Sequence, residues 1–302
     1  MARLLYERRV LDKMPNVNGN NPFLIGEPVS SVDQFFGRSK QTRAILEYVR
    51  NGQCISLVGP AGIGKTSLLN HVSDPRIRTR WRLGPQMALF GRLEGKELAG
   101  RDQAACLVWF VDQILAQAAV VDAALAARMR EAIAGRSGGH MGLRTLFRVL
   151  DGEGIRPVVT LDDFDDLARN AQLEDSFFAA LRSLATGCQV SYVVASLKPL
   201  YELETMRPEA STLCGICQQM PLPPLSGEES RSMVEALLER GEATFPASIV
   251  DRILSWGRNE PRRLQLAGHE AFRVWQENGG SLNGSEGAAL ERRWERAAAP
   301  GS

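Results

Sequence analysis

Hydrophobic and polar positions follow two different periods along the chain up to about residue 224. Short apolar runs, which are typical of buried strands, cover residues 53–58, 87–93, 156–163, 189–196 and 216–222. Apolar residues spaced three or four apart, which indicate helices, cover 41–50, 65–72, 141–150 and 176–185, with two further helices within 101–134. Strands that alternate with helices predict an α/β fold in which helices cover both faces of a parallel sheet.

The pattern changes at both ends of this region. Residues 1–32 are rich in Asn, Gly and Pro and predict an irregular segment. The sequence PLPPLSG at 221–227 marks a boundary, after which every apolar pattern is helical. We therefore expect an irregular segment at 1–32, an α/β domain at 33–224, a small helical lid at 225–280, and a C-terminal helix or tail at 281–302.

Four arginines alternate with other residues in the segment DPRIRTRWR, at positions 76, 78, 80 and 82. In an extended segment these side chains would all point to one side. We expect a solvated surface there, with contact to nucleic acid as the alternative.

Composition limits the class of protein. The chain has 302 residues, of which 44% are hydrophobic and 24% charged, and this excludes a largely disordered protein. No apolar run has the length of a signal peptide or an uninterrupted membrane span, so we expect a cytoplasmic protein without a membrane partner. The net charge of +1 does not indicate a nucleic-acid partner. Only 5 of the 36 basic residues are lysines, so each lysine is informative.

One of these lysines lies in a phosphate-binding motif. GPAGIGKT at 59–66 has the spacing GxxxxGKT, and it stands between a predicted strand and a predicted helix. Backbone N–H groups of such a loop surround a phosphate at the N-terminus of the helix. We expect nucleotide binding by Gly59, Pro60, Ala61, Gly62, Ile63, Gly64, Lys65, Thr66 and Ser67. Lys65 would contact the terminal phosphates, and the Thr66 hydroxyl would be a ligand of Mg²⁺.

Two adjacent aspartates end the predicted strand at 156–163. A hydrated Mg²⁺ needs a carboxylate close to the phosphate loop, and Asp162 would supply it. Asp163, one residue further, would orient or deprotonate the attacking water. Paired aspartates at a strand end also cap helices, but beside a phosphate loop we favour the catalytic interpretation. For Asp165 and Asp166 we expect a capping or surface position.

Taken together, these motifs resemble the STAND and AAA+ ATPases. The resemblance covers residues 33–275 and rests on FFGR (35–38), GPAGIGKT (59–66), VVTLDDFDDL (158–167), VVASLKPLYEL (193–203) and LPPLSGEES (222–230). The paired aspartates are more similar to STAND proteins than to AAA+ motors, and the spacing is similar to bacterial AAA-like STAND ATPases of signalling and conflict systems.

The resemblance implies further site residues. Phe36, Gly37 and Arg38 would lie near the adenine, and Ser196 would sense the terminal phosphate. Many STAND proteins have an arginine directly after that polar residue, whereas this chain has Leu197.

In the lid, WGRNEPRRLQLAG at 256–268 is similar to the helix entry that reaches back over the nucleotide. This nominates Pro261, Arg262 and Arg263, of which we favour Arg262. Arg207 would stand where an arginine finger of a neighbouring subunit originates.

Three functions agree with these features. The first is a slow regulatory ATPase that uses ATP/ADP and Mg²⁺ and couples its nucleotide state to an effector or sensor protein in trans or to homo-oligomerisation, in a bacterial defence or signalling system. The second is an AAA+ ATPase that assembles on duplex DNA as a transposition regulator or loader. The third is a nucleotide-binding interaction module with negligible turnover.

Overall fold

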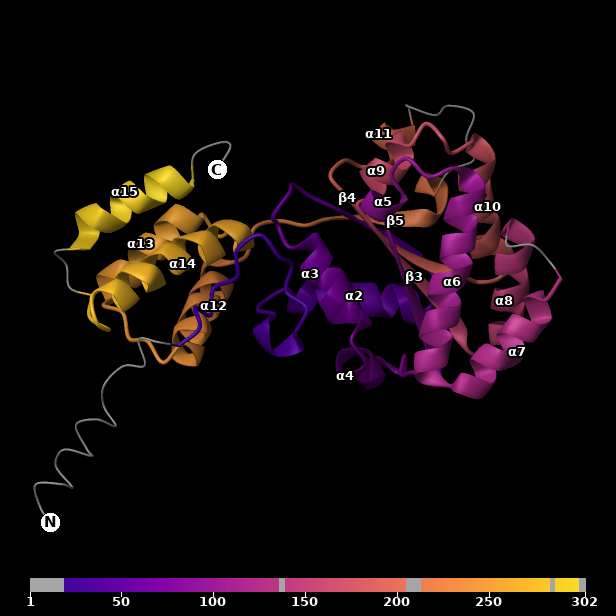
Figure 1. The fold of residues 1–302 in the computed structure, drawn as a ribbon, viewed down its shortest axis with the longest axis horizontal. Helices are drawn as coiled ribbons and strands as arrows, with labels where there is room; N and C mark the ends of the chain where they lie inside the picture. The colour runs from indigo at the N-terminus through magenta and orange to yellow at the C-terminus, as the bar shows by residue number, and fades with distance from the viewer. Residues whose placement is uncertain (1–18, 136–138, 205–212, 283–285, 299–302) are drawn as a thin grey trace, which may run out of the picture.

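The computed structural model describes residues 19–135, 139–204, 213–282 and 286–298, and its centre is a five-stranded parallel sheet. The strand order is β2-β3-β4-β1-β5 (Figure 1). The strands are β1 (Cys54–Val58), β2 (Ala88–Glu94), β3 (Arg156–Asp162), β4 (Ser191–Ser196) and β5 (Cys217–Pro221). All five predicted strands are therefore confirmed.

Helices cover both faces of the sheet. The α/β domain contains α2 (Ser39–Arg50), α3 (Lys65–Ser73), α4 (Pro75–Arg78), α5 (Gly95–Leu98), α6 (Gln103–Val121), α7 (Ala123–Ile133), α8 (His140–Gly152), α9 (Phe164–Arg169), α10 (Asp175–Gly187) and α11 (Leu200–Glu204), with short 3₁₀ turns at Val32–Gln34, Thr79–Trp81 and Cys214–Ile216. Alternate strand residues face opposite sides: Val158 and Val193 pack with α2 and α3, whereas Val159 and Tyr192 pack with α6, α8 and α10. This confirms the predicted α/β architecture.

The last four helices form the lid. They are α12 (Gly227–Arg240), α13 (Ala247–Gly257), α14 (Pro261–Glu277) and α15 (Gly287–Ala297), and they lie to one side of the sheet (Figure 1). Their apolar faces share a core of their own, which includes Leu237, Ile253 and Trp275. Ser226 begins α12 with a capping box, in which its hydroxyl accepts the backbone N–H of Glu229 while the Glu229 carboxylate accepts that of Ser226.

Residues 19–29, which we call the N-terminal segment, join the lid to the α/β domain. The Leu24 backbone N–H donates to Gln265 Oε1 of α14 (2.9 Å), and the Val29 N–H donates to Ser67 Oγ of α3 (3.0 Å). Phe23 is buried in the lid core, directly against Gly268. The predicted irregular backbone is present here, while residues 1–18 lie outside the described part of the chain.

The solvated surface expected for the four alternating arginines is present at Arg76, Arg80 and Arg82 but not at Arg78, because the segment is helical rather than extended. Asp74 caps a helical turn by accepting the Arg76 backbone N–H (2.8 Å), and Pro75 occupies the first helical position. Arg78 is buried; its guanidinium donates to the carbonyls of Leu83 and Ala88 and lies 4.6 Å from the centre of the Phe90 ring. The four arginines therefore do not form one basic surface.

Helix α6 is the one described helix that is long and apolar enough to cross a membrane by length and composition. Its mean hydropathy is 1.8, and 39% of the apolar stretch is buried inside the protein. Cys106, Phe110 and Ile114 share one side of the helix and belong to the core beside the sheet. This packing explains the apolar residues on that side of α6.

Candidate functional site

A cavity of about 710 Å³ lies where the carboxyl ends of the strands meet the lid. The phosphate loop, the N-terminal segment, the ends of β2 and β3, and the start of α14 all contribute to its wall. In parallel α/β sheets this edge is the usual place for a ligand, because the loops after the strands converge there.

The phosphate loop has the backbone that its glycines predict. Gly62 and Gly64 adopt φ values of +80° and +97°, which residues with a Cβ rarely adopt. Lys65, the first residue of α3, donates from Nζ to the carbonyl oxygens of Gly59 (2.6 Å) and Pro60 (3.1 Å). Burial lowers the pKa of Lys65, and the nearby carboxylates of Asp162, Asp165 and Asp163 oppose this effect.

Asp162 lies at the end of β3 and is 3% exposed. Burial raises the pKa of its carboxyl group, although a hydrogen bond with the Thr66 hydroxyl and the charge of Arg92 counteract part of the shift. Arg92 Nη2 lies 3.1 Å from Asp162 Oδ2, and Arg92 also pairs with Glu94 at 2.8 Å. The two predicted metal ligands, Thr66 and Asp162, are thus brought together.

Asp163 begins α9 with a left-handed backbone, at φ +46°. Its carboxylate pairs with Lys96 Nζ at 2.8 Å, and this pair raises the pKa of Lys96. The Asp163 backbone lies so close to Gly95 that a Cβ at residue 95 would stand 2.1 Å from the Asp163 carbonyl oxygen. Gly95 therefore permits the close approach that places Asp163 at the cavity.

The start of α14 reaches the phosphate loop from the lid. The Arg262 backbone N–H donates to the Gly62 carbonyl (3.3 Å), and a Cβ at Gly62 would lie 2.7 Å from Arg262 Cδ. Pro261 also lines the cavity, whereas Arg263 places its guanidinium 5.6 Å from the centre of the Trp294 ring in α15. Of the two arginines, Arg262 contacts the phosphate loop, and its role toward a nucleotide stays a prediction.

The FFGR segment connects the phosphate loop to the base of the lid. Phe36 and Arg38 line the cavity, while Gly37 packs against the Glu229 side chain. The buried Arg38 guanidinium donates to the carbonyls of Ile63 (3.0 Å) and Pro223, and the Arg38 N–H donates to Glu229 Oε1 (2.8 Å). Burial lowers the pKa of Arg38, opposed by the charge of Glu229. Arg38 thus ties three segments together in addition to lining the cavity.

Ser196 does not line the cavity. It is fully buried at the end of β4, and its hydroxyl donates to the Lys198 carbonyl (2.6 Å), while Leu197 reaches the cavity wall. Its own carbonyl accepts the Gly59 N–H (3.2 Å). The predicted role of Ser196 as a phosphate sensor stays a prediction, and Arg207 lies outside the described residues.

The surface position expected for Asp165 is wrong. Asp165 is 2% exposed, and its carboxylate accepts the backbone N–H groups of Leu197 (2.6 Å) and Lys198 (3.3 Å). It therefore fixes the loop that follows β4. Asp166 lies in the first turn of α9, lines the cavity with its side chain 36% exposed, and is 3.6 Å from Arg169, which agrees with the expected position at a helix start or surface.

Sequence reasoning missed Arg92 and Lys96. Both enter the cavity from β2 and the turn after it because β2 is the neighbour of β3, with Glu94 opposite Asp162. The sequence does not state which strands are neighbours. The rarity of lysine was the signal that directed attention to Lys65, and it applies equally to Lys96.

The residues present fit a nucleotide and Mg²⁺. The loop glycines expose backbone where a phosphate would approach, and the buried Asp162 carboxylate is held next to the Thr66 hydroxyl, a donor set of hard oxygen atoms. Leu24, Phe36 and Met233 add apolar surface to the same cavity. Among the described residues no three His, Cys, Asp or Glu side chains form a metal cluster, so the Mg²⁺ ligands would be one carboxylate, one hydroxyl and phosphate or water oxygens.

Solved structures share this fold at low sequence identity. A Walker-type ATPase of Pyrococcus abyssi matches with a TM-score of 0.63 and 14% identity over 91% of this chain and 76% of that protein. The Aeropyrum pernix ORC2 protein matches with a TM-score of 0.63 and 15% identity over 95% and 72%. Domain III of the Thermotoga maritima replication initiation protein DnaA gives 0.54 and 16% over 89% and 98%.

Sequence comparison gives the family. No curated protein sequence matches the chain significantly. The model of the family described as novel STAND NTPase 1 matches residues 29–291, which include the phosphate loop, Asp162, Asp163 and α14. The five-stranded sheet, the lid and this match agree, and the chain belongs to the novel STAND NTPase 1 family.

Proposed function

We propose that this NTPase hydrolyses ATP slowly and uses its nucleotide state to set the position of the lid, and thereby the binding of a partner protein or of further copies of itself. The observation that carries the proposal is the contact of Arg262 with Gly62, which joins the lid to the phosphate loop at the cavity that holds Asp162 and Asp163. A nucleotide at this junction would contact both domains, so its binding energy would differ between lid positions.

Each end of the cavity suits a different part of ATP. Phe36, Leu24 and Met233 offer apolar surface to the adenine, and the loop N–H groups and Lys65 receive the phosphates. Mg²⁺, held through Thr66 and Asp162, would neutralise charge on the phosphate oxygens. Asp163 would accept a hydrogen bond from the attacking water and orient it, while Arg262 would supply positive charge from the lid.

Two ion pairs support a slow, regulated reaction. Lys96 forms an ion pair with the Asp163 carboxylate, and Arg92 forms one with the Asp162 carboxylate. Both carboxylates must release or share these cations before they can act on water and metal. A signal that shifts Lys96 or Arg92 would then raise turnover.

The partner belongs to one of two general classes. The resemblance to STAND proteins of signalling and conflict systems supports a cytoplasmic sensor or effector protein in trans, or self-association, within a bacterial defence or signalling pathway. The alternating arginines at 76–82 no longer support the DNA-loader alternative, because Arg78 is buried and Arg76 pairs with Asp74 and Asp33.

The experiment measures assembly and turnover in the same samples. Size-exclusion chromatography with light scattering, with and without ATP and Mg²⁺, is combined with phosphate release for wild type and Lys65→Ala. Lys40→Ala is the matched control, because Lys40 is an exposed lysine of α2 away from the cavity.

We expect slow phosphate release that falls about 100-fold in Lys65→Ala and stays unchanged in Lys40→Ala, since a phosphate-contacting cation acts mainly in the transition state. An ATP-dependent change in molar mass or elution volume should disappear in the same variant. If turnover occurs without any such change, the protein is an ATPase but not a switch on its own. If ATP neither binds nor is hydrolysed, the proposal is wrong.

A further inference from the structure

A second pocket lies at the opposite edge of the sheet, at the amino ends of β2, β3 and β4. Its volume is about 360 Å³, within the range of small-molecule sites. Arg50, Arg82 and Arg156 line it together with Asp151, so these four side chains carry a formal charge of +2. This pocket is separate from the nucleotide cavity and shares no lining residue with it.

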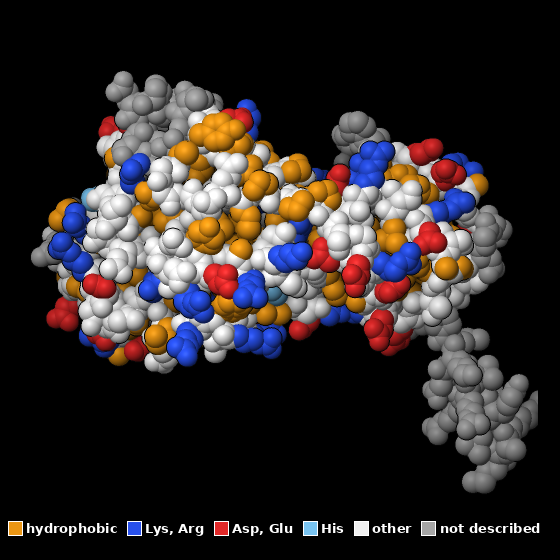
Figure 2. Space-filling view, turned by 180° about the vertical axis from the view of Figure 1, so that it is seen from behind, with side chains coloured by type: hydrophobic (Ala, Val, Ile, Leu, Met, Phe, Trp, Pro, Cys, Tyr) orange, Lys and Arg blue, Asp and Glu red, His pale blue; other side chains and the backbone are white. Residues whose placement is uncertain are grey.

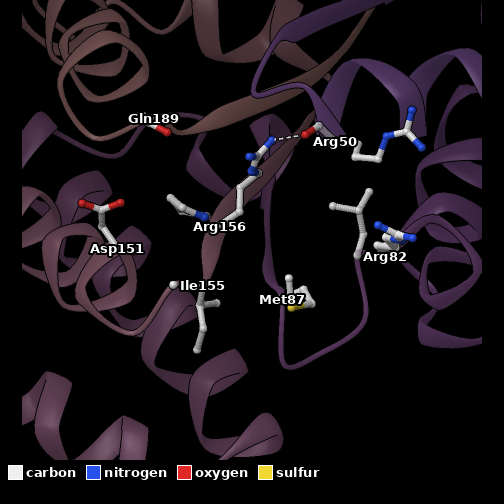
Figure 3. A pocket seen from close by; sticks show the side chains of 10 residues that line it. Arg50, Arg82, Met87, Asp151, Ile155, Arg156 and Gln189 are labelled. Carbon is white, nitrogen blue, oxygen red and sulfur yellow. Dashed lines mark hydrogen bonds between the residues drawn. The ribbon is translucent and has the colours of Figure 1, made fainter.

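One of the three arginines has a structural role. Arg156 Nη1 donates to the carbonyls of Val49 (2.8 Å) and Arg50 at the C-terminus of α2, where unpaired carbonyls carry partial negative charge (Figure 3). Arg156 therefore satisfies the helix end and holds the pocket wall in place.

The other two arginines are uncompensated. Within the described ranges neither the Arg50 nor the Arg82 guanidinium has a hydrogen-bond or ion-pair partner. Figure 3 shows Arg50 and Arg82 on one side of the pocket and Asp151 on the other. Two guanidinium groups on the same side of the pocket, neither in an ion pair with a described residue, suit an anion with several oxygen atoms, which guanidinium binds in a bidentate manner.

The pocket wall also contains apolar side chains and two residues with a left-handed backbone. Ile155 is half-buried and Met87 is 54% exposed, so both offer apolar surface to a ligand in the pocket. Arg82 and Gln189 both have left-handed backbones, at φ +60° and +51°. Such backbone strain in residues with a Cβ is concentrated at binding sites, because the fold must hold it in place.

We propose that this pocket binds a small organic phosphate of about the size of a nucleoside monophosphate. Arg50 and Arg82 hold the phosphate, and Met87 and Ile155 contact the less polar part of the molecule. A nucleic-acid backbone fits less well, because the pocket is concave and the neighbouring Arg76 and Arg78 are engaged within the protein.

Binding is measured by isothermal titration calorimetry on the full chain saturated with ADP and Mg²⁺, which occupies the nucleotide cavity. The probes are the four ribonucleoside 5′-monophosphates, ribose 5-phosphate and pyrophosphate, with adenosine as the phosphate-free control. The double variant Arg50→Gln with Arg82→Gln removes both unpaired charges and keeps most of the length of each side chain.

The matched control is Arg80→Gln with Arg130→Gln, which removes the same charge from exposed positions outside the pocket. We expect at least one phosphate probe to bind saturably at about 150 mM salt. Its affinity should fall about tenfold or more in the pocket variant and change less than about twofold in the control, since charge-assisted bidentate contacts are lost in one case only. An unchanged melting temperature in both variants confirms that they are folded.

Three results would overturn the proposal. The first is the absence of saturable binding by every phosphate probe up to about 5 mM. The second is binding that both variants weaken equally, which indicates general charge attraction. The third is binding of a short DNA or RNA duplex that depends on Arg50 and Arg82 while none of the small probes binds, which assigns the surface to nucleic acid.

Discussion

The two edges of the sheet differ in whether their positively charged side chains have oxygen partners. At the carboxyl edge the cations of the phosphate loop, β2 and α5 have oxygen partners: Lys65 bonds to loop carbonyls, Arg92 pairs with Asp162 and Glu94, and Lys96 pairs with Asp163. At the amino edge Arg50 and Arg82 have no partner among the described residues.

This difference separates two kinds of site. Partnered charges that must exchange partners are suited to regulated chemistry, because each exchange is a step that a ligand or a partner protein can influence. Unpartnered arginines on a fixed wall are suited to binding, since an incoming anion does not have to displace a protein carboxylate. Substitutions at equivalent positions of the two edges test this distinction.

The largest expected effect is on the reaction itself. We expect Asp163→Asn to lower kcat for ATP hydrolysis about 100-fold with little change in nucleotide affinity, because the amide cannot accept a proton from water. Asp151→Asn, at the amino-edge pocket, is the control and should leave kcat unchanged. Steady-state phosphate release and calorimetric ATP binding separate the two parameters. Equal rates in wild type and Asp163→Asn would mean that Asp163 is not catalytic and would favour a module with negligible turnover.

The next effect is on stability. We expect Gly95→Ala to lower the free energy of unfolding by about 3 kcal/mol, because its Cβ would stand 2.1 Å from the Asp163 carbonyl oxygen and the backbone must move. Gly154→Ala at the amino edge should cost only about 1 kcal/mol, from its φ of +69°, since no atom lies within 4 Å of that Cβ. Urea unfolding compares the two, and equal losses would show that the contact at Gly95 relaxes easily.

A smaller effect of opposite sign is expected at Asp162. Its raised pKa means that the folded protein favours the protonated form, so the ionised carboxylate destabilises the nucleotide-free protein at neutral pH. This cost is fully present above the folded-state pKa and vanishes as the pH falls to the ordinary value of 3.8. Asp162→Asn should therefore stabilise the nucleotide-free protein by about 1 kcal/mol at pH 7 while abolishing Mg²⁺-dependent hydrolysis.

The exposed Asp151 is the comparison for this prediction, and Asp151→Asn should change the free energy of unfolding by less than about 0.5 kcal/mol. Thermal unfolding between about pH 3.5 and pH 8, which spans the ordinary carboxyl pKa, measures both variants. A loss of stability in Asp162→Asn at pH 7 would mean that the pair with Arg92 outweighs the cost of burial.

The smallest expected effect concerns Lys96. Its side chain is 72% exposed, so its pair with Asp163 is weak in water and easily exchanged. We expect Lys96→Gln to raise basal ATP turnover about threefold, since more of the Asp163 carboxylate is available to water. Lys198→Gln is the control, because Lys198 is 59% exposed and pairs only loosely with Glu202 at 3.9 Å. A fall in turnover would show instead that Lys96 stabilises the phosphate.

Local sequence patterns predicted the fold well, because the spacing of apolar residues within each element reflects which of its sides are buried. The apolar runs of the strands, the helical spacing of the apolar residues and the GxxxxGKT motif are each read within a few residues. They were sufficient for the five strands, the lid and the placement of Lys65, Thr66 and Asp162 at one edge of the sheet.

Contacts between residues far apart in the sequence could not be predicted from local patterns. Arg92 and Lys96 reach the aspartates only because β2 pairs with β3, a choice made by packing across the whole domain. The arginine segment differs in part from the expected solvated face for another reason: the local signal of Asp74 followed by Pro75 starts a helical turn, so the alternating arginines do not share one side. That signal was present in the sequence and outweighs alternation over so short a stretch.

The N-terminal segment has a mechanical consequence. Phe23 is buried in the lid core, and the Val29 N–H donates a hydrogen bond to Ser67 of α3. Residues 24–28 therefore connect the lid to the α/β domain. If the lid rotates, residues 24–28 must either extend or displace α3. Gln276 of α14 donates to the Gly19 carbonyl (2.9 Å), so a fluorophore attached at Gly19 would move with the lid and report its rotation against one on the sheet domain.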